Sequence, residues 1–460
     1  MSNTRSFPGS FRFIDLFAGV GGFHHALADL GGTCELAVEL DAEARSVYRA
    51  SFPEMAAGAI VSDIRDLTRE SANPDAPELH PDQVRDRVPE HDVLCAGFPC
   101  QPFSKSGFQQ GVRDKTRGTL FFDVMSIVIA RQPEFVILEN VRNLAGPRHT
   151  DTWATIVESL REAGYRVAQE PLVMSPHLLR EDEGGAPQVR DRVFVLARRV
   201  RPGAPEEART GDVLAARAPS MGWDPDRWSV KKVLDRKVDL DVYGIRDAER
   251  TWLNAWQAFV QGIETDVLPG FPIWVDAFTQ VPQIEDDMPD WKKDFLRKNS
   301  RLYVDHQQFI DDWLAKRWGP LEQLVSEFPP SRRKFEWQAR KAQATRAKRD
   351  LEGLVAHMRP SGIRVKPPTY LPALVAITQT SVVGPKVTGT DWRRLTPREA
   401  ARLQRIPFQG FERAGVPDKA IYKQLGNAVN VGVVRHLAEL LFDDATVGDR
   451  VDSLRFSEAG

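Results

Sequence analysis

The residue with the clearest reactive potential is a cysteine between two prolines. Cys100 lies in the run Gly-Phe-Pro-Cys-Gln-Pro, directly after an apolar stretch at residues 92–96 that predicts a buried strand. Pro99 and Pro102 stiffen the loop, because each ring locks its own φ and restricts the residue before it. Such a loop, beyond the carboxyl end of a strand, is where open α/β sheets hold reactive groups. Most free cysteines are instead small buried hydrophobic residues, so the thiol alone does not establish a nucleophile.

Acidic and guanidinium side chains adjoin other predicted strands. Glu139 ends a strand, and Gln188, Arg190 and Arg192 lead into the strand at residues 192–197. Alternate residues of an extended segment share a face, so the last three are expected to point the same way. Planar hydrogen-bonding groups in this arrangement suit a polar base edge or a phosphate. The alternative is that these charged residues protect an exposed edge strand from pairing with another chain.

A glycine turn near the amino terminus is typical of a nucleotide site. An apolar run at residues 11–17 leads to Ala-Gly-Val-Gly-Gly, and Glu39 follows Gly19 by 20 positions. Glycines let the backbone approach a ligand, and an acid at this spacing accepts hydrogen bonds from ribose hydroxyls. The pattern favours an adenosine-type ligand over a plain tight turn and a solvated carboxylate. Because the run is Gly-x-Gly-Gly, it does not match a dinucleotide site.

The elements that must position these residues alternate between strands and helices. This order predicts an α/β fold with a doubly wound, mainly parallel sheet. We expect residues 67–90, which are polar and contain proline, to form a surface connection. The remaining predicted strands are residues 34–40, 59–64, 133–138 and 165–173, and the predicted helices are residues 23–30, 119–131 and 152–163.

Composition limits the class of protein. A chain of 460 residues predicts two domains, and 42% hydrophobic with 27% charged residues is ordinary for a soluble globular protein. The net charge of −2 requires that any polyanion site be a local patch. Three cysteines form no disulfide framework or metal-ligand set. There is no apolar segment of a signal peptide or membrane span, so we expect a cytoplasmic protein without metal or membrane contact.

The middle of the chain differs from its ends. Nine of the eleven tryptophans lie between Trp223 and Trp337, which predicts a second core. Residues 331–350 carry eight Lys and Arg against Glu336 and Asp350. Their alanine-rich spacing predicts a helix that contacts phosphates, with a solvated helix face as the alternative.

Six blocks in order resemble the DNA cytosine-5 methyltransferase family. The resemblance covers residues 11–200 and 390–440. The blocks are residues 15–22 (DLFAGVGG), 97–104 (GFPCQPFS), 139–141 (ENV), 188–192 (QVRDR), 394–404 (RLTPREAARLQ) and 424–429 (QLGNAV).

The resemblance implies catalytic roles. Cys100 resembles the nucleophile that adds to carbon 6 of cytosine, and Glu139 the acid that holds ring nitrogen 3 and the exocyclic amine. Covalent addition makes carbon 5 enamine-like, which divides one difficult step into easier ones. Arg192 would contact the base carbonyl and orient Glu139, with Arg190 and Gln188 in support. The target base must leave the duplex, and residues 104–119 resemble a loop that closes over it.

The resemblance also implies S-adenosyl-L-methionine as methyl donor and a discontinuous catalytic domain. Residues 1–201 and 390–460 would form the catalytic domain, and residues 202–389 a target recognition domain. A phosphate contact near the flipped base would fall to Thr369, Arg364 or Thr378. The implied donor-site residues are Phe17, Gly19, Gly21, Gly22, Glu39, Asp63, Ile64, Leu120, Asn427 and Val429.

The expected partner is double-stranded DNA, methylated at a specific sequence by a monomer. A paired restriction endonuclease is expected, although an orphan regulatory methylase fits the chain equally. The alternatives are a tRNA-acting member of the fold, a catalytically silent DNA-binding paralogue and an unrelated nucleotide-binding oxidoreductase. The long middle region disfavours the tRNA-acting enzyme. The presence of Cys100 and Glu139 disfavours the silent paralogue, and the incomplete glycine motif disfavours the oxidoreductase.

Overall fold

The chain folds into two compact units. In the computed structural model, unit 1 is Met1–Asp224 with Ala401–Gly460, and unit 2 is Pro225–Ala400. The assignment of unit 2 to target recognition stays a prediction. In the described part of the chain, no helix has both the length and the apolar character that a membrane crossing requires. The structure describes residues 10–99, 120–200, 224, 227–339, 348–374 and 381–443.

Unit 1 is built on an eight-stranded mixed sheet of order β3-β2-β1-β4-β5-β9-β6, with β7 also paired to β9. The neighbours from β3 to β5 are parallel, whereas β9 is antiparallel to β5, β6 and β7. The predicted α/β fold with a mainly parallel sheet is confirmed. The strands are β1 (Phe11–Leu16), β2 (Gly32–Val38), β3 (Ile60–Val61), β4 (Val93–Ala96), β5 (Phe135–Val141), β6 (Tyr165–Val167), β7 (Leu172–Met174) and β9 (Arg192–Arg199), with the short β8 (Gln188–Val189) before the last.

Strands β6 and β7 lie end to end along one edge of β9. Both are antiparallel to β9, with Tyr165 opposite Arg199 and Leu172 opposite Phe194, so they run in the same direction. The strand predicted over residues 165–173 is therefore present but interrupted, because residues 168–171 break the pairing and shift its register by two residues.

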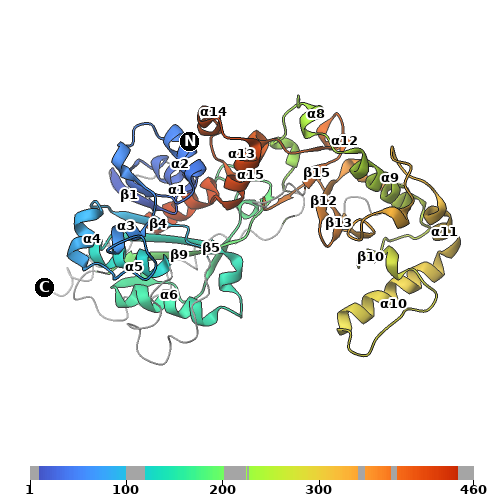
Figure 1. Cartoon of the computed structure of the whole chain (residues 1–460), viewed down its shortest axis with the longest axis horizontal. Helices are drawn as coiled ribbons and strands as arrows, with labels where there is room; N and C mark the ends of the chain where they lie inside the picture. The colour runs from blue at the N-terminus through green and yellow to red at the C-terminus, as the bar shows by residue number, and fades with distance from the viewer. Residues whose placement is uncertain are drawn as a thin grey trace, which may run out of the picture. The chain divides into compact units, whose positions relative to one another are not determined.

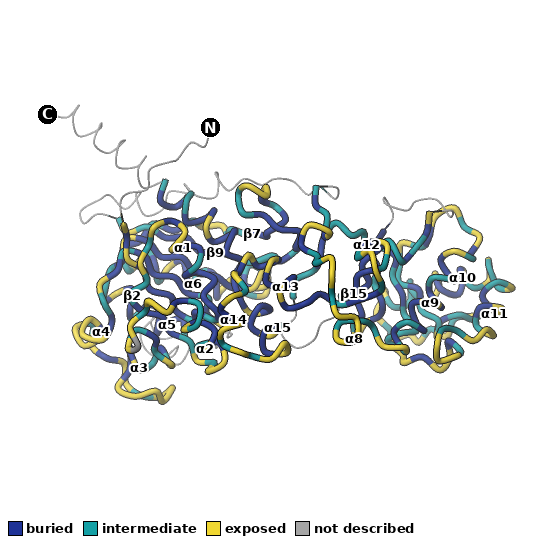
Figure 2. Tube along the Cα trace, turned by 90° about the horizontal axis from the view of Figure 1, so that it is seen from above, coloured by how far each residue is buried: buried dark blue, intermediate teal, exposed yellow. Residues whose placement is uncertain are grey.

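Helices bury the central strands. All four residues of β4 and the first six of β5 are buried, as expected for strands covered on both faces. Figure 2 shows the neighbouring strand β9 as largely buried too. Figure 1 shows α13 and α15, red in the chain colouring, beside the blue amino-terminal elements of this unit. The helices are α1 (Gly22–Ala28), α2 (Ala42–Ser51), α3 (Arg65–Thr68), α4 (Pro81–Arg87), α5 (Leu120–Arg131), α6 (Thr150–Glu162), α13 (Pro397–Gln404), α14 (Gln409–Ala414) and α15 (Asp418–Asn427), and residues 431–443 are also helical.

One predicted loop contains a helix. Helix α4 lies within residues 67–90, because His80 and Gln83 form a capping box and Val84 supplies a buried anchor. The expectation of a plain surface connection is therefore wrong for this stretch.

Unit 2 has its own sheet and core. Its six-stranded sheet has the order β10-β11-β13-β12-β15-β16. Trp252, Trp256, Trp313, Trp337 and Trp392 all belong to one buried cluster. The elements are α8 (Leu240–Tyr243), α9 (Asp247–Gly262), α10 (Asp290–Asp305), α11 (Gln307–Ala315), α12 (Pro385–Thr388), β10 (Ile273–Trp274), β11 (Lys334–Trp337), β12 (Val355–Arg359), β13 (Gly362–Lys366), β14 (Leu371–Pro372), β15 (Ser381–Val383) and β16 (Arg393–Arg394).

The helix predicted over residues 331–350 is wrong at its start. Residues Lys334–Trp337 form strand β11, in which Phe335 and Trp337 alternate inward. This two-residue period buries both aromatic rings against the core, and that burial outweighs the helix propensity of the neighbouring alanines. Residues 340–347 lie outside the described part of the chain.

A buried ion pair joins α3 to α5. Arg69, just after α3, places its Nε 2.7 Å from one Asp123 oxygen and its Nη2 3.1 Å from the other. The two side chains are only 2% and 1% exposed, and Thr68 donates to the same carboxylate.

We expect Asp123→Ala to lower the free energy of unfolding by about 3–5 kcal/mol, because it leaves the Arg69 guanidinium buried without its counterion. Urea unfolding followed by circular dichroism measures this. Glu439→Ala, which removes the exposed partner of Arg435, should cost no more than about 1 kcal/mol. The double variant Arg69→Met/Asp123→Leu should recover most of the loss. An Asp123→Ala protein as stable as the control would contradict the assignment.

Candidate active site

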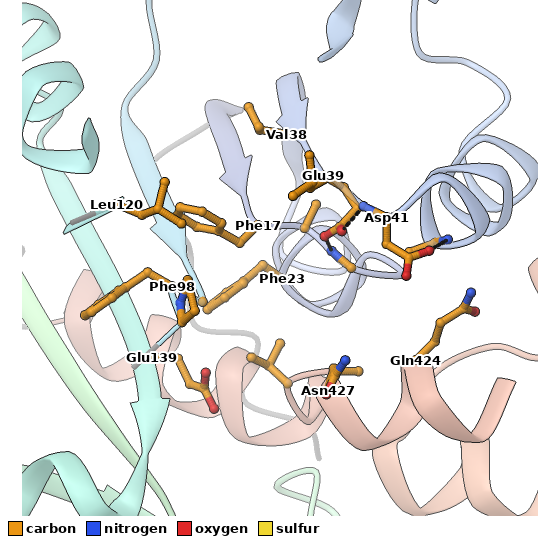
Figure 3. A pocket seen from close by; sticks show the side chains of 18 of the residues that line it. Phe17, Phe23, Val38, Glu39, Asp41, Phe98, Leu120, Glu139, Gln424 and Asn427 are labelled. Atoms are coloured by element: carbon orange, nitrogen blue, oxygen red, sulfur yellow. Dashed lines mark hydrogen bonds between the residues drawn. The ribbon is translucent and has the colours of Figure 1, made fainter. Parts of the chain in front are cut away.

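A cavity of about 460 Å³ opens at the carboxyl ends of the parallel strands of unit 1. This volume is in the range of small-molecule sites. Its lining comes from both segments of the unit, and Figure 3 shows Phe17, Glu39, Leu120, Glu139 and Asn427 around the same space. Ten residues predicted from sequence line it: Phe17, Gly19, Glu39, Asp63, Ile64, Leu120, Glu139, Arg192, Asn427 and Val429.

The glycine turn after β1 wraps around the Glu39 carboxylate. Backbone N–H groups of Gly19 and Asp41 each donate to one Glu39 oxygen, both at 2.7 Å (Figure 3). Each carboxylate oxygen has a second lone pair, so Glu39 can still accept from ligand hydroxyls. Phe17 and Gly19 adopt φ values of 59° and 57°, which turn the chain sharply at the strand end.

Gly21 and Gly22 do not line the cavity but let its walls approach each other. A Cβ on Gly22 would lie 2.5 Å from Cγ2 and 2.9 Å from the carbonyl oxygen of Val429. A side chain here would therefore displace the segment that carries Asn427. Gly21 adopts φ 87° and packs against the Phe52 ring.

Loop residues after β3 and the start of α5 form another wall. Asp63 accepts from the backbone N–H of Arg65 and pairs with its guanidinium at 3.0 Å. Ile64 and Leu120 add apolar surface, and the Arg69–Asp123 pair lies between the elements that carry them. The wall is thus built from segments joined through buried charge.

Several cavity residues were missed by the sequence reasoning. Asp41 and Lys423 form an ion pair at 2.6 Å, which lowers the pKa of the Asp41 carboxyl. Gln424 is only 6% exposed, yet neither amide atom has a hydrogen-bond partner among the residues that the structure describes. Buried amides are normally satisfied, so this group is available to a polar ligand. Their closeness in sequence to predicted site residues could have revealed two of them. Gln424 begins the block at residues 424–429, and Asp41 is two residues beyond Glu39.

Glu139 is a buried acid held by a guanidinium. Its Oε1 lies 2.9 Å from Nε of Arg192, and the residue is 8% exposed. Burial raises the pKa of Glu139, and the positive charges of Arg192 and Arg190 oppose that rise. Asn140 donates from Nδ2 to the Phe98 carbonyl at 2.9 Å. The strand end that carries the acid therefore fixes the start of the cysteine loop.

Arg190 and Gln188 lie beside the cavity without lining it. Arg190 donates from Nη2 to the carbonyls of Gly426 at 2.9 Å and Ala428 at 2.7 Å. Burial, reinforced by the nearby Arg192, lowers the pKa of Arg190 to about 9, so it stays charged at neutral pH. Gln188 is fully buried in β8. Arg190 thus supports the segment that carries Asn427.

Cys100 and the loop at residues 104–119 lie outside the described residues. Pro99, the last described residue before Cys100, lines the cavity. The other two cysteines are free, and burial raises the pKa of both the Cys34 and the Cys95 thiol. Neither is suited to form a thiolate. Within the described ranges, no three His, Cys, Asp or Glu side chains gather as a metal site would require.

Comparison with known proteins agrees with this geometry. Type II methyltransferase M.AluI of Cellulosimicrobium cellulans is 40% identical across 93% of this chain and 91% of its own length. Shorter matches include a DNA-cytosine methyltransferase of Escherichia coli K12, 41% identical over 35% of this chain and 36% of that protein. Type II methyltransferase M.HhaI of Haemophilus parahaemolyticus is 38% identical over 40% and 48%.

The family profile extends through both segments of unit 1 and much of unit 2. The profile described as C-5 cytosine-specific DNA methylase matches residues 11–234 and 274–443. The chain therefore belongs to the C-5 cytosine-specific DNA methylase family and is a DNA (cytosine-5-)-methyltransferase.

Proposed function

We propose that the cavity of unit 1 binds S-adenosyl-L-methionine, the methyl donor that this family uses. The cavity lining suits the three parts of this molecule. Glu39 can accept from the ribose hydroxyls, and Phe17, Ile64 and Leu120 can contact the adenine ring. The Gln424 amide, which has no partner among the described residues, can bind the polar end. The bound donor supplies an electrophilic methyl group.

Glu139 and Arg192 form the base-holding end of the site in this proposal. Protonated Glu139 donates to ring nitrogen 3 of a flipped-out cytosine, while Arg192 orients the acid and contacts the base carbonyl. The Cys100 thiolate adds to carbon 6, and the electron pair displaced from the ring double bond reaches nitrogen 3 as it takes the proton. Carbon 5 is then nucleophilic and receives the methyl group. Loss of the carbon 5 hydrogen as a proton to a base, departure of the Cys100 thiolate and return of the nitrogen 3 proton to the Glu139 carboxylate then restore the aromatic ring. The single observation that carries this proposal is Glu139, buried and paired with Arg192 in the same cavity as Glu39.

Unit 2 serves target recognition in the proposal, and the substrate is double-stranded DNA. It has a separate core and sheet, as a reading domain set into a catalytic domain would need. Two similar proteins carry the name Type II methyltransferase, which supports pairing with a restriction endonuclease. We infer that the enzyme acts as a monomer on a specific sequence.

Replacing Cys100 tests the nucleophile. Labelled methyl from S-adenosylmethionine should enter unmethylated duplex DNA with the wild-type protein and not enter tRNA. Cys100→Ala should lower the rate by at least about 10³-fold, because carbon 5 is then not activated by covalent addition. Cys34→Ala is the matched control and should remain active. Label in tRNA alone would overturn the substrate, and an active Cys100→Ala enzyme would overturn the mechanism.

The pH dependence tests Glu139. Its protonated form is the donor, so the single-turnover rate constant should fall as pH rises through the pKa of Glu139. Arg192→Met removes a cation that lowers this pKa, so the alkaline limb should move to higher pH. Glu139→Gln should lose the limb and about 10²–10⁴-fold in rate. A limb unmoved in Arg192→Met, or retained in Glu139→Gln, would assign the titration to another group.

Gly22→Ala tests the donor pocket. The added Cβ clashes with Val429, and overpacking of this kind costs about 1–3 kcal/mol. If this cost falls on the donor-bound state, S-adenosylmethionine should bind roughly ten- to hundredfold more weakly in titration calorimetry. Gly58→Ala, where a Cβ meets nothing within 4 Å, is the control. Equal affinities in the two variants would argue against the assigned pocket.

A further inference from the structure

The sheet of unit 2 has two chemically different faces. Residues directly opposite on neighbouring strands share a face, so the register sorts the side chains. Trp337, Val365, Ala356 and Val382 lie in one row across four strands and belong to the buried core. The opposite row, on the same four strands, is Glu336, Arg364, His357 and Ser381.

Cations dominate this second face. Arg359 and Lys366 extend it along β12 and β13, one two-residue step from His357 and Arg364. The two steps run in opposite directions, because Arg359 lies opposite Gly362 and Lys366 opposite Val355. Each step is about 7 Å, so Arg364 lies between the outer two cations, which are about 14 Å apart along the strands. Strands β11, β12, β13 and β15 carry the side chains around these cations. Glu336 is the one acid on these four strands.

That acid is already engaged. Arg364 binds Glu336 through Nη2 at 2.7 Å and Nε at 2.8 Å, and Gln338 donates to its other oxygen. Among the described residues, neither Arg359 nor Lys366 has an ion pair or side-chain hydrogen bond. Both are half-buried, and burial together with neighbouring cations lowers the pKa of each side chain. Partly desolvated cations without a counterion are costly unless an anion joins them.

The neighbouring histidine is a neutral member of this face. His357 is fully buried and contacts the Ser381 hydroxyl through Nδ1 at 3.1 Å, while its Nε2 has no partner among the described residues. Burial, and then the charges of Lys366 and Arg359, lowers the pKa of His357 to about 3, so the ring is neutral at physiological pH. The positive charge of this face therefore comes from Arg359, Arg364 and Lys366, and His357 adds none.

We propose that Arg359 and Lys366 bind backbone phosphates of duplex DNA, with Arg364 fixed between them by Glu336. This inference rests on the proposed role of unit 2 in reading DNA. The chain has a net charge of −2, so attraction to a polyanion must come from a local group such as this one. Lys334, on the same face, lies over the Trp274 ring at 5.2 Å and extends the cationic row toward β10.

The salt dependence of DNA binding tests the proposal. The dissociation constant of a labelled duplex is measured by fluorescence anisotropy between about 50 and 200 mM salt, where each phosphate contact contributes a slope of about 0.9 in log–log form. Arg359→Gln and Lys366→Gln should each lower the slope by about 0.9, and the double variant by about 1.8. Arg359→Lys keeps the charge and should keep the slope. Arg297→Gln, which removes an exposed cation of α10 that has no partner among the described residues, should leave it unchanged.

The control measurements separate this inference from the proposed function. Affinity for S-adenosylmethionine should be equal in all variants, which shows that they are folded. If these cations contact phosphates, each variant should lose the same factor in affinity for duplexes of any sequence. A loss of affinity for one DNA sequence alone, at unchanged salt slope, would mean base reading and would overturn the proposal. An unchanged slope in both Gln variants would also overturn it, as would a loss of affinity for tRNA alone. If the wild-type protein transferred no methyl to DNA, the proposed function would fail, whatever the slopes.

Discussion

The cavity of unit 1 depends on one buried guanidinium. Arg190 joins residues 236 and 238 positions away by donating to the Gly426 and Ala428 carbonyls. Those carbonyls flank Asn427, so the carboxy-terminal wall is held where the strand ends of the first segment need it. A buried cation is tolerated only where hydrogen bonds and opposite charge offset its lost hydration, and Glu139 contributes that charge. The same group therefore couples the returning segment to the electrostatics of the acid.

The charge arrangement around Glu139 balances opposing effects. Burial favours the protonated acid, whereas Arg192 at 2.9 Å and the more distant Arg190 favour the carboxylate. An exposed acid would be ionised throughout the physiological range and could not donate a proton. An acid buried without the guanidinium groups would have no fixed orientation. The cavity thus combines a desolvated proton donor with a rigid hydrogen-bonding frame for a base.

Unit 2 uses sheet alternation to separate stability from binding. The inward row joins tryptophans in a core built from the unit's own residues, while the outward row can carry charge. Arg364 is neutralised by Glu336, but Arg359 and Lys366 are not neutralised by any described residue. These two positive charges contribute little to folding, so a ligand is their simplest explanation. A polyanion supplies the negative charge that they lack.

Local sequence determined much of the catalytic half. The glycine turn and Glu39 each follow a strand, and Glu139 lies near the carboxyl end of β5. Parallel strands bring their carboxyl ends to one edge, so the types and spacing of these residues are enough to place them together. Resemblance to a family added Asn427 and Val429, which no periodicity would place beside Phe17. Only the tertiary structure decided that Arg190 holds the returning segment and that Lys334–Trp337 is a strand. It also decided that, within the described part of the chain, Gln424 is buried without a hydrogen-bond partner and Arg359 and Lys366 share a face without an ion pair. Each of these facts depends on contacts between residues far apart in the chain, and short-range pattern and propensity carry no information about which distant segments will meet.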